Sequence, residues 1–75
     1  MYADIIVDIS YEKLDRIFQY RIPKELAGRL TVGSRVEIPF GAGNRRISGY
    51  VVGFSEYADY PEEKLKKIIR VMENS

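Results

Sequence analysis

Residues 36–53 read VEIPFGAGNRRISGYVVG, with a strand-like run on each side of a loop that contains two glycines and an asparagine. Before the loop, Val36, Ile38 and Phe40 recur at every second position, which is the period of a half-buried strand. After the loop, the run ISGYVVGF is rich in the β-branched and aromatic residues that favour strands. The stretch therefore predicts a β-hairpin.

The loop of this hairpin, GAGNRR, has two compatible interpretations. In the first, its glycines and Asn44 supply the positive φ angles of a tight connection, and Arg45 and Arg46 keep the loop soluble. In the second, Gly41 has no side chain and admits a ligand to the backbone, with the two arginines as positive charges. The loop alone does not decide between a plain turn and part of a binding site.

Two earlier runs, residues 3–10 and residues 17–22, alternate in the same way and are predicted to be strands. Gln19 lies on the polar face of the second run, and Pro23 lacks an N–H donor and should end it. The residues predicted to share the apolar faces of these strands are Ile5, Val7, Ile9, Phe18, Tyr20 and Ile22.

Three parts of the sequence depart from the simple alternation of a strand. Gly49 and Gly53 interrupt the strand after the loop, which predicts a bulge, a sharp bend or a close backbone approach. Residues 24–30, KELAGRL, favour one or two helical turns ended by Gly28. Residues 61–72, PEEKLKKIIRVM, match an amphipathic helix, but IIRVM also has the composition of a closing strand, so both remain open.

Together these patterns predict one domain over residues 1–75 with a mostly β (small α+β) fold. We expect a compact, barrel-like sheet of about five or six short strands with one or two short helices. Phe18, Phe40 and Phe54 lie in strand patterns and are predicted to pack in the core.

Composition excludes several classes of function. The 75 residues include no cysteine and no histidine, so disulfides, Cys/His zinc sites, thiol nucleophiles and imidazole bases are absent. The carboxylates have no spacing typical of acid–base catalysis, and no phosphate-binding Walker motif occurs. We therefore expect that the chain is not an enzyme and that it binds no cofactor.

Charge and hydropathy bear on partners and location. The net charge is only +1, but residues 16–46 contain seven basic and two acidic side chains, which fits either a local anion site or solvated strand edges. No apolar run approaches the roughly 20 residues of a membrane span, and acids stand where a signal peptide would be basic. We expect a cytoplasmic protein without a membrane partner.

Several short motifs occur in order along the chain: FQYRIP, then GSRVEIPFG, then GYVV, then PEEKLK. In this order the chain resembles the N-terminal domain of the primosomal replication-restart helicase PriA family (primosomal protein N′). That family has Phe-Asp-Tyr, Gly-x-x-Val-x-Val-Pro-Phe-Gly, Gly-x-Val-Val and Pro-x-x-x-Leu-Lys at compatible spacing. The resemblance covers nearly the whole chain and favours a short helix over residues 61–67 followed by a strand near residues 68–72.

The resemblance implies a DNA-binding module that recognises the 3′ end of the nascent leading strand at a stalled fork. Proteins of that family are ATP-dependent 3′→5′ helicases with a zinc-binding insertion. ATP, Mg²⁺ and zinc are therefore expected only in parts of a parent protein that this sequence lacks. Expected partners are DNA, other domains of the parent helicase and other primosome proteins.

The resemblance also implies a set of pocket residues. Phe18 matches the phenylalanine of Phe-Asp-Tyr, Gly41 the glycine of Pro-Phe-Gly, and Lys66 the lysine of Pro-x-x-x-Leu-Lys. Gln19 replaces the aspartate that is associated with the terminal base in the family, and its amide both donates and accepts hydrogen bonds. Contacts from Arg45 and Arg46 to the DNA backbone are our own inference.

Two other functions remain open at this point. The rhythm of VGSRVEI and SGYVVGF is also typical of SH3-like, KOW-type RNA-binding modules, although FQYRIP and PEEKLK have no place in that pattern. A small β domain with a free strand edge is also suited to binding a peptide strand as a protein-binding adaptor.

Overall fold

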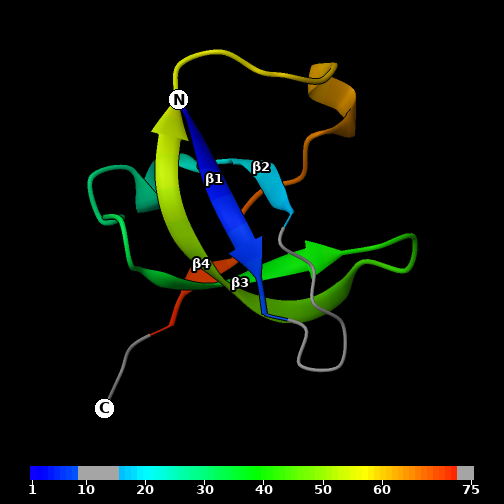
Figure 1. Ribbon diagram of the computed structural model, residues 1–75, viewed down its shortest axis with the longest axis horizontal. Helices are drawn as coiled ribbons and strands as arrows, with labels where there is room; N and C mark the ends of the chain where they lie inside the picture. The colour runs from blue at the N-terminus through cyan, green and yellow to red at the C-terminus, as the bar shows by residue number, and fades with distance from the viewer. Residues whose placement is uncertain (9–15, 73–75) are drawn as a thin grey trace.

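The computed structural model describes residues 1–8 and 16–72, which form a mostly β domain (Figure 1). A five-stranded antiparallel sheet has the order β2-β1-β4-β3-β5. Within the described residues the elements are β1 (Tyr2–Val7), β2 (Ile17–Arg21), the 3-10 helix η1 (Lys24–Leu26), β3 (Arg35–Phe40), β4 (Arg45–Ser55), the 3-10 helix η2 (Glu62–Lys64) and β5 (Arg70–Val71). The predicted fold class is confirmed.

The core follows the two-residue period of the sequence. Ile5 and Val7 of β1 are buried as expected, whereas the predicted third member of that face, Ile9, lies outside the described residues. Burying branched aliphatic side chains of this kind stabilises a fold by roughly 1.5–3 kcal/mol each. The buried cluster consists of Ala3, Ile5, Val7, Tyr20, Leu26, Val36, Ile38, Val51 and Ile68.

The long strand β4 is curved and pairs with both β1 and β3 (Figure 1). A Cβ atom on Gly49 would lie 2.6 Å from Cγ2 of Ile5 and 2.9 Å from the carbonyl oxygen of Ile6. Glycine is therefore required here for β1 and β4 to approach. The register between these strands shifts between Asp4 and Ile5, opposite Gly53 and Val51, which confirms the predicted bulge.

The sheet does not close into a barrel through its strands, because β2 and β5 stand at opposite edges. The segment that precedes β5 links them. Lys67 forms an isolated parallel bridge with Arg21 at the end of β2, and Ile69 N–H then donates to the carbonyl oxygen of Glu37 in β3 (2.8 Å). The tail thus connects β2, at one edge of the open sheet, with β3 near the other edge.

The tail contains a short helix followed by a strand, as predicted, but both are shorter than expected. The predicted helix over 61–67 is the single 3-10 turn of η2, and the predicted strand over 68–72 is β5 with two residues. No helix in residues 1–8 and 16–72 is long and apolar enough to cross a membrane.

The prediction that three phenylalanines pack in the core is wrong for Phe54 and only partly right for the other two. Phe54 is 37% exposed because it lies near the end of β4, where η1 and its neighbours do not cover it fully. Phe18 and Phe40 pack against the core from its margin. Their position leaves part of each ring facing a pocket.

Candidate functional site

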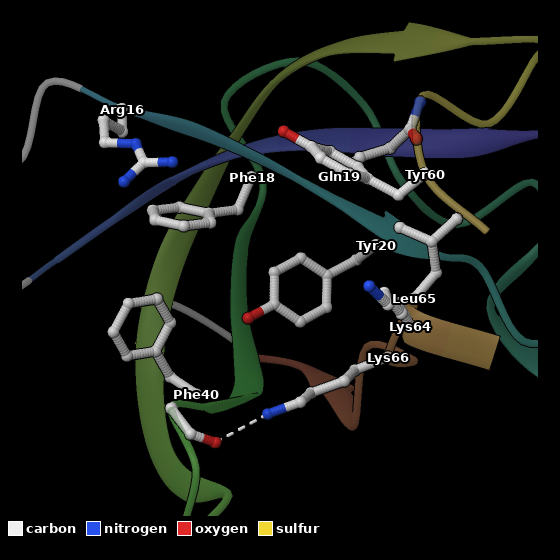
Figure 2. Close-up of a pocket in the computed structure, with 10 residues that line it drawn as sticks. Arg16, Phe18, Gln19, Tyr20, Phe40, Tyr60, Lys64, Leu65 and Lys66 are labelled. Atoms are coloured by element: carbon white, nitrogen blue, oxygen red, sulfur yellow. Dashed lines mark hydrogen bonds between the residues drawn. The ribbon is translucent and has the colours of Figure 1, made fainter. Parts of the chain in front are cut away.

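A pocket of about 350 Å³ opens where β2, the end of β3 and the segment around η2 meet (Figure 2). We call it the aromatic pocket. Its volume lies at the lower end of the range of about 300–1,000 Å³ that is usual for small-ligand sites. It is lined by Arg16, Phe18, Gln19, Tyr20, Phe40, Gly41, Tyr60, Lys64, Leu65 and Lys66.

One wall of the aromatic pocket is a pair of perpendicular rings. The centroids of Phe18 and Phe40 are 5.1 Å apart at an angle of 88°, an edge-to-face arrangement that favours both rings. Beside them, the hydroxyl of Tyr20 donates to the carbonyl oxygen of Pro39 (2.7 Å). Burial raises the pKa of Tyr20 to about 12, so this hydroxyl stays protonated at neutral pH and holds β2 against β3.

Next to Phe40, the aromatic pocket is bounded by the hairpin loop and the tail. Gly41 adopts a φ of +76°, which non-glycine residues rarely adopt, and its carbonyl oxygen accepts from Asn44 N–H (3.1 Å) to form the turn. The ammonium of Lys66 donates to the same carbonyl oxygen (2.7 Å), as the dashed line in Figure 2 shows. Two residues that are 25 positions apart therefore meet at the pocket.

The charge of the pocket lining is positive. The guanidinium of Arg16 lies 5.3 Å from the ring centre of Phe18, a cation–π contact at the margin of the pocket. Lys64 and Lys66 add two more cations, and none of the described lining residues is acidic. Aromatic faces next to cations suit a ligand that has a flat ring and a negative group.

Gln19 is the amide side chain of the lining, and it is buried, with 8% of its surface exposed. Its amide nitrogen donates to the carbonyl oxygen of Tyr57 (2.9 Å), and its amide oxygen accepts from Asp59 N–H (2.8 Å). Both ends of the amide are therefore engaged by the backbone of the segment between β4 and η2.

Main-chain contacts of Arg21 hold the tail against β2. Arg21 N–H donates to the carbonyl oxygen of Lys66 (2.8 Å), and Ile68 N–H donates to that of Arg21 (3.1 Å). The Arg21 side chain adds a bond from Nε to the carbonyl oxygen of Leu65 (3.1 Å). These contacts fix the position from which the Lys66 side chain reaches the loop.

The structure brings together four of the six residues predicted for the site. Phe18, Gln19, Gly41 and Lys66 all line the aromatic pocket, although they come from distant parts of the sequence. Arg45 and Arg46 do not line it. They are exposed at the start of β4, and Nη1 of Arg46 lies 4.0 Å from Oε1 of Glu37.

Sequence reasoning did not assign Arg16, Tyr60 or Phe40 to the site. Arg16 and Phe40 stand next to assigned positions, two residues before Phe18 and directly before Gly41, so adjacency was an available signal. Tyr60 directly precedes Pro61 of the Pro-x-x-x-Leu-Lys motif, but the motif does not specify the contacts that place it, such as those of Gln19 with a segment about 40 residues away.

A second cavity, of about 460 Å³, lies beside η1. We call it the apolar hollow. Among residues 1–8 and 16–72, no charged or polar side chain lines it, and its lining residues are Met1, Ile22, Leu26, Ala27, Gly28, Leu30 and Phe54. Among the described residues, no group of three or more acidic side chains is placed to hold a metal ion.

Comparisons with known proteins agree with the resemblance in the motifs. Residues 4–75 match a family model described as a 3′DNA-binding domain (3′BD) of PriA. The Replication restart protein PriA of Bacillus subtilis is 39% identical over 67 residues, which are 89% of this chain and 8% of that protein. The protein of the same name from Haemophilus influenzae is 37% identical over 60 residues, 80% of this chain and 8% of the relative. The chain thus spans a small part of the relatives that it matches.

Proposed function

Because the chain belongs to the family of PriA 3′DNA-binding domains, we propose that its aromatic pocket binds the 3′-terminal nucleotide of a DNA strand. The observation that carries this proposal is the meeting of Lys66 with the carbonyl oxygen of Gly41 beside the Phe18–Phe40 pair. This arrangement places the hydrogen-bonding groups of Lys66 and Gly41 next to two aromatic rings in a pocket of about 350 Å³.

The chemistry of the lining supports a nucleotide as the ligand. Bases stack on aromatic side chains, and each such contact contributes about 1–3 kcal/mol to the binding of single strands. Phe18 and Phe40 present ring surface, while Arg16 and Lys64 are positioned to neutralise a phosphate. Gln19 also lines the pocket, and we retain it among the proposed site residues.

The 3′-hydroxyl is assigned to the corner formed by Gly41 and Lys66. An ammonium has three donor protons, and only one is needed for the bond to the Gly41 carbonyl oxygen. The others are available to a hydroxyl placed beside Gly41, where nothing lies within 4 Å of the position of a Cβ. A 3′-phosphate is larger and would leave polar groups without good partners.

The pocket would bind only the terminal nucleotide, so the rest of the DNA strand requires other contacts. We assign Arg45 and Arg46 to the DNA backbone, because both are exposed beside the loop that contains Gly41. Only one or two phosphate contacts are expected, in line with a net charge of +1.

The names of the relatives support a wider role. They are named replication restart proteins, and the chain corresponds to 8% of their length. We propose that residues 1–75 act as the end-recognition module of an ATP-dependent 3′→5′ helicase in the cytoplasm, directing it to the nascent leading strand at stalled forks. ATP, Mg²⁺ and zinc would bind in other parts of that protein, and primosome proteins would be its partners.

Fluorescence anisotropy with matched oligonucleotides tests the proposal. A strand with a free 3′-hydroxyl should bind about five- to 150-fold more tightly than its 3′-phosphorylated or circular counterpart, the range expected when buried polar groups lose their partners. Phosphorylation of the 5′ end should have little effect. Equal affinity for circular and free-ended strands would overturn the assignment. Tighter binding of structured RNA in competition would favour an RNA-binding module instead.

A further inference from the structure

The buried side chain of Gln19 is hydrogen-bonded within the protein, so few of its polar groups and little of its surface are available to a ligand. It stands between Phe18 and Tyr20 in β2, and successive residues of a strand point to opposite faces. One donor and one acceptor of its amide bind Tyr57 and Asp59, and only 8% of the residue is exposed. The direct influence of Gln19 on a bound base is therefore small.

The same two hydrogen bonds determine where the next aromatic residue lies. They fix the backbone at residues 57 and 59, and Tyr60 follows immediately, before Pro61 restricts the chain at the start of η2. Tyr60 lines the aromatic pocket and is 54% exposed, so its ring has surface free for a ligand (Figure 2). Tyr57, in the same segment, is 80% exposed and is not part of the lining.

We propose that Tyr60 is a further nucleotide-contacting residue and that Gln19 is a positioning residue, which acts on the site through Tyr60. This inference rests on the proposed function of the aromatic pocket. The ring of Tyr60 supplies a stacking surface from the η2 side, in addition to Phe18 and Phe40. A carboxylate at position 19 has no donor for the carbonyl oxygen of Tyr57 at neutral pH and cannot hold the segment in the same way.

Two tyrosine variants test the contact itself. Tyr60→Ala should weaken binding of a free-ended oligonucleotide about five- to 150-fold, the effect of losing one base–aromatic stack, and Tyr60→Phe should stay within about twofold of the original chain. Tyr57→Ala is the matched control and should bind normally. Normal binding by a folded Tyr60→Ala variant, or equal losses for both alanine variants, would overturn the proposal.

A double-mutant cycle tests the role of Gln19. If Gln19 acts through Tyr60, Gln19→Ala should weaken binding when Tyr60 is present and have little further effect in the Tyr60→Ala background. Additive losses would show that Gln19 contacts the nucleotide independently, against the proposal. If Gln19→Ala does not fold, Gln19→Glu takes its place, because it keeps the acceptor for Asp59 N–H and loses the donor for Tyr57.

Different results would contradict the proposed function and the role of Tyr60. If the original chain does not distinguish a free 3′-hydroxyl from a 3′-phosphate, the proposed function fails, whatever the tyrosine variants do. If it does distinguish them and Tyr60→Ala binds normally, only the role of Tyr60 fails. Thermal melts of each variant separate loss of binding from loss of fold.

Discussion

The aromatic pocket and the apolar hollow are lined by some residues of the same types, but their linings differ in polarity and charge. Each has a glycine with positive φ, Gly41 at +76° in the pocket and Gly28 at +81° in the hollow. Each also has a partly exposed phenylalanine, Phe18 and Phe54 respectively. The hollow is larger, at about 460 Å³ against about 350 Å³, yet it has no polar side chain to orient a ligand.

We therefore base the proposed site on the chemistry of the lining and not on the size of the cavity. Specific recognition requires a few polar groups at fixed positions within apolar surroundings, and only the aromatic pocket has them. Its polar groups are fixed by contacts between distant segments, Lys66 with the hairpin loop and Gln19 with the segment before η2. Substitutions made in pairs, one in each cavity, can therefore separate function from packing.

The largest effect is expected from the two glycines. Gly41→Val should abolish binding of a free-ended strand, because the new side chain occupies the open space beside Lys66. Gly28→Val is the matched control, since nothing lies within 4 Å of its Cβ position either. Both variants should lose about 1–2 kcal/mol of folding stability, from valine in a left-handed conformation. Calorimetric or circular-dichroism melts measure the stability and anisotropy measures the binding.

Two results would contradict this expectation. Full affinity in a folded Gly41→Val variant would remove the loop from the site. Equal loss of binding in Gly28→Val would show that both effects arise from destabilisation alone.

The phenylalanines should give the next largest difference. Phe18→Ala removes a ring from the wall of the aromatic pocket and should weaken binding about five- to 150-fold. Phe54→Ala removes a comparable ring from the apolar hollow and should leave the affinity of the folded chain unchanged. Anisotropy titrations corrected for the folded fraction measure both. A binding defect in Phe54→Ala would indicate that DNA also reaches the apolar hollow.

A smaller effect is expected from two neighbouring lysines. Lys66→Ala should reduce affinity for a free 3′ end about tenfold, as expected for one hydrogen bond to a charged group, and should narrow the difference between free and blocked ends. Lys67→Ala removes an equal charge from an exposed position outside the pocket and should preserve that difference. If both variants lose affinity equally for free and blocked ends, Lys66 acts only as a surface charge.

The smallest effect concerns salt. One or two phosphate contacts predict a slope of about −1 for log K against log salt, at about −0.7 for each neutralised phosphate of a single strand. Removing either Arg45 or Arg46 should make the slope shallower by up to about 0.7, whereas Arg29→Ala, next to the apolar hollow, should not change it. A slope of about −4 or steeper would indicate a long backbone-tracking groove instead of an end pocket.

Much of the fold was predictable because it depends on local patterns. Alternation in β1 and β2, the glycine-containing loop and the glycines of β4 each correspond to a strand, turn or bend in the structure. The exposure of Phe54 was not predictable, because it depends on how much of β4 the distant η1 region covers. Periodicity indicates which face a residue occupies, but not whether that face is covered at its end.

The candidate site was predictable only in part, for a related reason. Motif resemblance identified Phe18, Gln19, Gly41 and Lys66, and these do lie together. It did not show that both ends of the Gln19 amide bind backbone atoms of Tyr57 and Asp59, since the motif specifies a residue type and not its partners. Tyr60 was missed for the same reason.

The hydrogen bonds between Arg21 and the tail have a consequence for folding during synthesis. During synthesis β2 leaves the ribosome first, the hairpin loop follows, and Lys66 emerges more than 40 residues after β2. Closing so long a loop is entropically unfavourable until the tail can pair with Arg21 and β3. A growing chain can therefore form its first hairpins while the contact between Lys66 and Gly41 is still missing. If the proposed function holds, binding of a DNA end should be acquired late, once β5 has docked.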